Sequence, residues 1–241
     1  MTKRILMLAS NPATSPVTGW PIGFWWAELS HAFEVFKEAG QDVTIASPDG
    51  GDLQADGYSD PEDESGYSAG DTISLAFKKD PDKMALLKDT PALSDLNIAD
   101  FDAIFVVGGQ GPMVTMMNDE KTHKAVADFY EAGKITAAVC HGTCVLLKTK
   151  LSNGELLVKG KRWTGFANSE EEYAENAVGM KIQPFWIETE ARKLSDTSFE
   201  VAGPLEEFAI RDGLLVTGQQ QVSAAAAARE VNDALASQKT G

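Results

Sequence analysis

The chain has 241 residues, which is enough for one large domain with a full hydrophobic core. Its composition, with 43% hydrophobic and 24% charged residues, is that of an ordinary soluble globular protein. The formal net charge of −15 repels phosphate backbones and anionic lipid surfaces, so we expect neither nucleic-acid nor membrane partners.

Only two cysteines, Cys140 and Cys144, occur in the chain, and this count argues against a disulfide framework. No signal peptide is evident at the N-terminus, and the longest apolar runs are too short for a membrane span. We therefore expect a reducing, cytoplasmic location. Two cysteines and three histidines give no zinc-binding spacing, so we predict no metal site and no cofactor.

The N-terminal residues predict a β-α-β unit. Its elements are a buried strand over 3–10, a loop over 11–23, a helix over 24–39 and a second strand over 42–47. In the helix, Leu29, Phe33 and Phe36 fall on one stripe, and Gly40 suits the C-terminal cap. The loop lies at the carboxyl edge of the sheet, where open α/β sheets bind ligands.

Glu28 lies near the start of this helix, beside Trp25 and Trp26. A carboxylate there is most often a surface acid that the helix dipole stabilises. Alternatively, it points into a pocket formed by the preceding loop. Aromatic neighbours would then partly desolvate it and raise its pKa, as general acid–base catalysis requires.

Residues 48–98 are predicted to be a loop-rich, acidic insertion, and the acids over 49–82 are expected to form a solvated face. Within it, residues 66–70 read GYSAG and match the G-x-S-x-G pattern of serine hydrolases. That pattern requires a buried strand before the serine, whereas the residues here are DPEDES. We therefore interpret Ser68 as a turn residue.

Residues 101–107 predict the next strand, which runs into a glycine-rich segment over 108–112. This segment is either a tight turn or a nest of free N–H groups that binds an oxyanion, and the two interpretations are compatible. An amphipathic helix is expected over 119–132, with His123 on its solvent-facing side.

The segment from Ile135 to Leu147 reads ITAAVCHGTCVLL, an apolar strand that stops abruptly at Cys140 before a run that can be helical. A nucleophile at such a strand-to-helix turn is exposed above the sheet. The N-terminus of a helix also favours thiolate over thiol. We predict that Cys140 is reactive. The alternative is an inert buried cysteine, which is the usual state of this residue type.

The C-terminal part continues the alternation of strands and helices. Its predicted elements are a short strand over 161–166, a helix over 168–176, a helix over 183–192, a hairpin of strands over 208–211 and 214–217, and a terminal helix over 219–237. We expect one domain over 1–241 with a doubly wound, mostly parallel α/β sheet and helices on both faces. This fold class is flavodoxin-like and similar to the class I glutamine amidotransferases.

A cysteine nucleophile usually needs a base and a group that orients the base. No histidine follows His141, so the distant histidine of the amidotransferase triad cannot exist here. His141 must serve locally, held by a carboxylate from the cluster Glu170, Glu171 and Glu172.

Four motifs together resemble the DJ-1/PfpI superfamily, and within it the heat-shock-31-like class of glutathione-independent glyoxalases (glyoxalase III). They are GFWWAELSHAF around Glu28, VVGGQGPM, VCHGTCVLL and TGFANSEEE. The resemblance covers nearly the whole chain. It implies that Cys140 is the nucleophile, that Glu28 is the acid facing it, and that His141 and Glu171 complete the triad.

The resemblance also implies an oxyanion or substrate-binding site at Gly108, Gly109 and Gly142, including the N–H of His141 or Gly142. One position departs from the class, which commonly has Pro after the Cys-His-Gly sequence, where this chain has Thr143. This difference puts the identity of the substrate in doubt.

By this resemblance, the expected function is a cofactor-independent glyoxalase that converts methylglyoxal and related 2-oxoaldehydes to D-lactate or the matching 2-hydroxy acid. The expected assembly is a homodimer. One alternative is a stress-response chaperone, protein deglycase or redox sensor, which an exposed patch of Trp20, Phe24, Trp25 and Trp26 would favour. Another is a different cysteine-dependent hydrolase or hydratase on the same scaffold.

Overall fold

The structure is a computed structural model and describes residues 2–238, so the extreme ends of the predicted 1–241 domain lie outside the described residues. Its centre is a six-stranded sheet in the order β4-β1-β5-β6-β10-β9. All neighbouring strands pair in parallel except β9 and β10, which form an antiparallel hairpin. The strands are β1 (Arg4–Leu8), β4 (Asp42–Ala46), β5 (Ala103–Val106), β6 (Ile135–Val139), β9 (Ala209–Asp212) and β10 (Leu215–Gly218).

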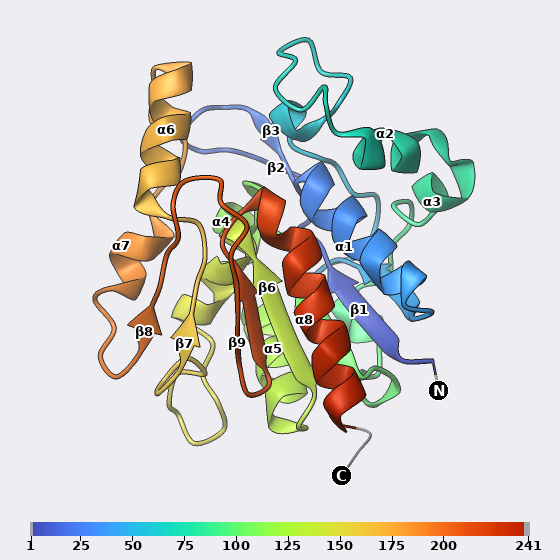
Figure 1. Ribbon diagram of the computed structural model, residues 1–241, viewed down its shortest axis with the longest axis vertical. Coiled ribbons are helices and arrows are strands. Elements are labelled where there is room, and N and C mark those ends of the chain that lie inside the picture. The colour runs from blue at the N-terminus through green and yellow to red at the C-terminus, as the bar shows by residue number, and fades with distance from the viewer. Residues whose placement is uncertain (1, 239–241) are drawn as a thin grey trace.

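Helices cover both faces of this sheet, which confirms the predicted fold class (Figure 1). The first and last helices pack side by side on one face, and α5 covers the other. The α-helices are α1 (Trp26–Glu38), α2 (Thr72–Lys79), α3 (Pro81–Ala85), α4 (Gly111–Thr115), α5 (Glu120–Glu131), α6 (Asn168–Val178), α7 (Ile187–Ala191) and α8 (Ala224–Ser237). Among the described residues, no helix is both long and apolar enough to cross a membrane.

The core strands are buried on both faces, as their continuous apolar runs predict. Every side chain of β5 and β6 is buried. The alanines of α8 lie close against the sheet: Ala224, Ala227 and Ala228 are fully buried. Small side chains therefore allow this helix to approach the strands, and the alanine run is part of the core.

Several predicted elements differ from the structure in detail. The loop over 11–23 contains a two-residue hairpin of β2 (Ala13–Thr14) and β3 (Pro21–Ile22). The helix predicted over 183–192 begins only at Ile187, after the irregular residues that follow α6. The strand predicted over 161–166 is limited to β7 (Arg162–Trp163), which pairs with β8 (Ser198–Phe199).

The acidic insertion is more ordered than its composition predicts. It contains α2, which packs beside α1 through a hydrogen bond between Ser30 and Ser74 at 2.8 Å and an ion pair between His31 and Asp71 at 2.8 Å. Phe77 of α2 is fully buried. The interpretation of this region as a purely solvated face was wrong, because its polar residues mask one buried side of a helix.

His123 is also placed differently from its prediction. It is half-buried on α5, its Nε2 atom has no hydrogen-bond partner among the described residues, and burial lowers its pKa. The aromatic patch is not exposed as a whole either, because Phe24 and Trp26 are buried in the core. Ser68 lies in a turn, as predicted, and its hydroxyl group donates a hydrogen bond to the carbonyl oxygen of Tyr58.

Candidate active site

Cys140 lies at the carboxyl end of β6, where the chain turns sharply. Its φ angle is +56°, a left-handed conformation that costs a non-glycine residue about 1–3 kcal/mol. Such strain persists only where the surroundings enforce it, and it is common at functional sites. The turn holds the side chain above the edge of the sheet, at the floor of a cavity.

The segment after Cys140 is a 3-10 helix over Cys140–Leu147, and this corrects the expectation of an ordinary α-helix. Thr143, at the position where the resemblance predicts proline, donates a hydrogen bond from Oγ1 to the carbonyl oxygen of Cys140 at 2.6 Å. Gly165 packs directly on that hydroxyl group, since an added Cβ there would lie 2.1 Å from it. Thr143 therefore fixes the turn by a hydrogen bond.

His141 lies beside the cysteine and is held by the predicted carboxylate. Its Nδ1 atom is 3.4 Å from Sγ of Cys140, and its Nε2 atom is 2.9 Å from Oε1 of Glu171. Phe166 stacks on the imidazole ring with 4.2 Å between the ring centroids. An ionised Glu171 accepts the Nε2 proton, so the lone pair of Nδ1 faces the thiol group.

The three consecutive acids at the start of α6 have three different environments. Glu170 caps the helix by accepting a hydrogen bond from the backbone N–H of Ala167 and also accepts one from Gln219. Glu171 turns inward to His141, and Glu172 is exposed to solvent. The structure thus separates the one acid that reaches the site from its two neighbours.

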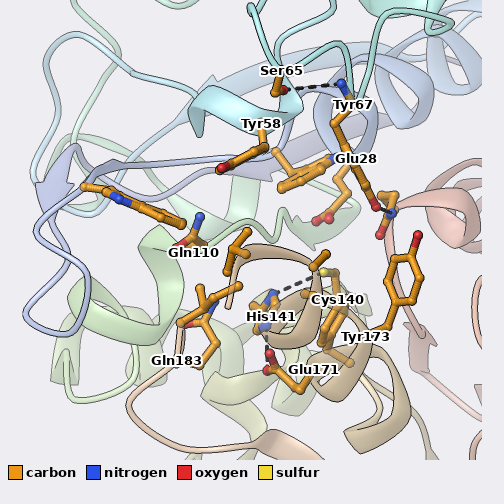
Figure 2. A pocket seen from close by; sticks show the side chains of 18 of the residues that line it. Glu28, Tyr58, Ser65, Tyr67, Gln110, Cys140, His141, Glu171, Tyr173 and Gln183 are labelled. Atoms are coloured by element: carbon orange, nitrogen blue, oxygen red, sulfur yellow. Dashed lines mark hydrogen bonds and ion pairs between the residues drawn. The ribbon is translucent and has the colours of Figure 1, made fainter. Parts of the chain in front are cut away.

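Glu28 reaches the site from the first turn of α1 and is fully buried. Figure 2 shows its carboxyl group directed toward Cys140. Burial raises its pKa well above 4.5, and the nearby carboxyl group of Asp56 raises it further. Among the described residues, neither of its oxygen atoms has a hydrogen-bond partner of good geometry. A buried polar group without a partner is rare and points to a ligand or a bound water.

The ionisation of Cys140 differs from its prediction. Burial and the negative charge of Glu28 raise the pKa of its thiol group well above 9.0, although the backbone N–H of His141 acts in the opposite direction. Only 2% of the side chain is exposed. The position at the start of a helix does not outweigh these two effects, so the thiol keeps its proton until a base removes it.

Three glycines allow the close approach of these segments. An added Cβ at Gly108 would lie 2.3 Å from Oε2 of Glu28 and 2.9 Å from Cβ of Cys140. Gly109 has a φ angle of +103° and lies against backbone atoms of residues 23–25, and Gly142 packs on the carbonyl oxygen of Val107. None of the three is among the described residues that line the cavity, and their oxyanion role stays a prediction.

Asp56, which the sequence analysis did not single out, links the insertion to the site. It is fully buried and accepts hydrogen bonds from the backbone N–H groups of Gly23 at 2.9 Å and Gln110 at 2.6 Å. Burial raises its pKa to about 7, although these two N–H groups act to lower it. Nothing in the sequence distinguishes this acid from the exposed acids around it.

The cavity above Cys140 has a volume of about 560 Å³. Its lining comes from the loop before α1, the insertion, the elbow and α6: Trp20, Trp25, Glu28, Tyr58, Ser65, Gly66, Tyr67, Gln110, Cys140, His141, Phe166, Glu171, Tyr173, Ala174, Ala177, Val178, Ile182, Gln183 and Gln221. Within the part of the chain that the structure describes, no group of three potential metal ligands is present.

Comparisons with known proteins agree on one family. The model of the DJ-1/PfpI family matches residues 23–233. The chain is 29% identical to "Glyoxalase 3" of Candida albicans, over 96% of this chain and 97% of that protein. Among solved structures, it is similar to the rapid encystment protein of Francisella tularensis, with a TM-score of 0.86, 26% identity, and 97% and 99% of the two chains covered.

A second solved structure, glyoxalase III from Candida albicans, has a TM-score of 0.77 and 26% identity. The match covers 96% of this chain and 97% of that one.

Proposed function

This chain belongs to the DJ-1/PfpI family, and from that premise we propose that it converts methylglyoxal and related 2-oxoaldehydes to 2-hydroxy acids, using Cys140 and no cofactor. Similarity to proteins named as glyoxalases over most of the chain supports this activity. The observation that carries the proposal is the convergence of a thiol, an imidazole held by a carboxylate, and an unpartnered buried carboxyl group on one cavity.

The first proposed step is addition of the thiol to the aldehyde. Nδ1 of His141 takes the proton of Cys140 while Sγ forms a bond to the aldehyde carbon. Glu171 stabilises the imidazolium ion that forms. The imidazolium then returns the proton to the aldehyde oxygen, which gives a neutral hemithioacetal. The substrate therefore draws the thiol out of its protonated state, and a resting thiolate is not required.

The second step moves hydrogen between the two substrate carbons. Glu28, in its ionised form, removes the hydrogen of the former aldehyde carbon as a proton and delivers it to the adjacent carbon. The hydroxyl proton of the hemithioacetal moves to the second oxygen, so the product of this isomerisation is a thioester of a 2-hydroxy acid. Burial makes Glu28 a stronger base than an exposed carboxylate, since its pKa is raised toward neutrality.

The last step is hydrolysis of the thioester. Water, activated by His141, attacks the carbonyl carbon, and Sγ of Cys140 leaves with a proton from the imidazolium ion. Backbone N–H groups near Gly109, His141 and Gly142 are the proposed donors to the developing oxyanion. One well-placed donor of this kind is worth about 3–4 kcal/mol.

The test is release of D-lactate from methylglyoxal in the absence of glutathione or any other thiol. We expect the wild-type protein to turn over and Cys140→Ala to lose activity by about 10³-fold or more, because the nucleophile is removed. Cys144→Ala is the matched control, since Cys144 is fully buried in the same 3-10 helix and does not line the cavity. Lactate release that survives Cys140→Ala would contradict the proposal.

We also propose that the protein is a homodimer and acts in the cytoplasm, as the family resemblance and the two free cysteines suggest. Light scattering in solution tests the assembly, and fractionation of cells tests the location. The redox-sensor alternative is less well supported, because oxidation requires an exposed cysteine with thiolate character. Cys140 is 2% exposed and has a raised pKa.

A further inference from the structure

The cavity is much larger than methylglyoxal, which has three carbon atoms. Its volume of about 560 Å³ lies within the range of about 300–1,000 Å³ for pockets that hold drug-sized ligands. Building on the proposed function, we infer that the preferred substrates are uncharged 2-oxoaldehydes with an aromatic or similarly bulky apolar group. The dicarbonyl end lies at Cys140, and the apolar group lies between the insertion and α6.

One wall of the outer cavity is aromatic. Trp25 and Tyr67 form an edge-to-face pair with ring centroids 6.0 Å apart, and Trp20 and Tyr58 form a tilted pair at 5.5 Å. Figure 2 shows Tyr58 and Tyr67 on the same side of the cavity, across from His141 and Glu171. Aromatic rings bind another ring through edge and face contacts that a methyl group cannot make as fully.

The opposite wall comes from the side of α6 that faces the cavity and is built from smaller side chains. Tyr173, Ala174, Ala177 and Val178 are all lining residues, and their spacing places them on one side of the helix. The two alanines leave space between the aromatic wall and the helix. Tyr67 and Tyr173 are 49% and 56% exposed, so they mark the entrance to this space.

Charge narrows the substrate class further. The acids Glu28 and Glu171 line the cavity, and among the described lining residues no lysine or arginine balances them. The chain as a whole carries a formal net charge of −15. A substrate with a carboxylate, including a hemithioacetal of glutathione, would meet repulsion without a cationic partner. An uncharged apolar group meets no such penalty.

The polar groups of the cavity are concentrated at its buried end. The carboxyl group of Glu28 and Oε1 of Gln110 are buried and have no hydrogen-bond partner among the described residues. The entrance is formed mainly by rings and aliphatic side chains. This gradient matches a molecule with two adjacent carbonyl groups at one end and an apolar body at the other.

The test compares initial values of kcat/KM for phenylglyoxal, methylglyoxal and the anionic aldehyde glyoxylate, with mandelate, lactate and glycolate as the measured products. A single methylene in an apolar pocket changes kcat/KM by about 10–200-fold, so we expect phenylglyoxal to exceed methylglyoxal by at least about tenfold. Glyoxylate is expected to be the poorest of the three. Equal values for phenylglyoxal and methylglyoxal, or a preference for methylglyoxal, would overturn the inference and leave the proposed function standing.

Two substitutions on α6 locate the preference. Ala174→Phe fills the space and is expected to lower the phenylglyoxal-to-methylglyoxal ratio of kcat/KM by at least about tenfold. Asn176→Phe adds the same ring to an exposed position outside the cavity and is expected to keep the wild-type ratio. Tyr67→Ala, on the aromatic wall, lowers the same ratio and serves if Ala174→Phe does not fold. Unchanged ratios in both cavity variants would contradict the inference, whereas failure to turn over any aldehyde would overturn the proposed function itself.

Discussion

The floor and the entrance of the cavity come from different parts of the chain and differ in burial. At the floor, Cys140, Glu28 and Glu171 are 2% exposed or less and lie at or near the ends of sheet strands and helices. At the entrance, Tyr67 and Tyr173 are about half exposed, and one of them comes from the insertion. Chemistry and selectivity are thus assigned to separate segments, so the entrance can vary without disturbing the elbow.

The two regions meet at Asp56. This acid belongs to the insertion, yet it accepts hydrogen bonds from the backbone of the loop before α1 and of the segment before α4. It also raises the pKa of Glu28. If floor and entrance are separate in function, substitutions at the floor should affect the rate for every aldehyde, and substitutions at the link should affect stability first.

Glu28→Gln is expected to have the largest effect of the floor substitutions that keep the thiol. The amide retains the shape of the side chain but cannot accept a proton, so kcat/KM should fall by about 10²–10⁴-fold. Glu38→Gln, an exposed acid on the same helix, is the control. Steady-state lactate release measures both, and a loss smaller than tenfold in Glu28→Gln would remove Glu28 from the proton transfer.

Glu171→Gln is expected to have a smaller effect, of about 10–100-fold, because it removes the group that orients His141 rather than the base itself. The pH profile of kcat/KM should also change, since the amide does not stabilise the imidazolium ion. Glu172→Gln, at the neighbouring exposed position, should keep both the rate and the profile of the wild type. An unchanged profile in Glu171→Gln would mean that the 2.9 Å contact has no catalytic role.

Asp56→Asn tests the link through stability. Its native pKa of about 7 is above the usual 3.8, so the native state binds more protons than the unfolded state between these values. The stability of the wild type should therefore decrease as pH rises through this window. In the variant, the amide leaves a backbone N–H without an acceptor, which costs about 1–3 kcal/mol.

The deficit of the Asp56→Asn variant should be largest near pH 4 and should shrink toward pH 7, because the variant lacks the ionisation that weakens the wild type. Urea denaturation across this range measures the difference. Asp63→Asn, at an exposed acid of the same insertion, is the control. A deficit that does not depend on pH would contradict the buried, protonated state of Asp56.

Ser68→Ala is expected to have the smallest effect. Its hydroxyl group holds a turn through a hydrogen bond to Tyr58 and does not line the cavity, so kcat/KM should change by less than about twofold. The assay is the same lactate release. Loss of activity on the scale of a removed nucleophile would show that the G-x-S-x-G match had been dismissed wrongly.

Much of the floor could be predicted because its signals are local in sequence. The buried strand that stops at Cys140 is visible as an apolar run, and the helix that carries Glu28 is visible from its periodicity. The choice of Glu171 among three consecutive acids came from the family resemblance alone. Composition gives no information on which of these acids turns toward His141.

The rest depends on contacts between distant segments. Asp56 lies in an acidic stretch, and its burial follows from loops that are 33 and 54 residues away in sequence. The raised pKa of Cys140 likewise results from the depth of the site and from Glu28, whereas the sequence shows only a strand followed by a helix. Helix α2 was missed because only one narrow side of it is apolar.

The most direct test of the account is to identify the covalent intermediate. The Glu28→Gln protein, which should form the hemithioacetal but pass slowly through the next step, is incubated with methylglyoxal, reduced with borohydride to trap the adduct, and digested for mass spectrometry. We predict a modification on the sulfur of Cys140 and an unmodified Cys144. Wild-type turnover accompanied by no adduct on Cys140, or by one on Cys144 alone, would contradict the central role of the elbow cysteine.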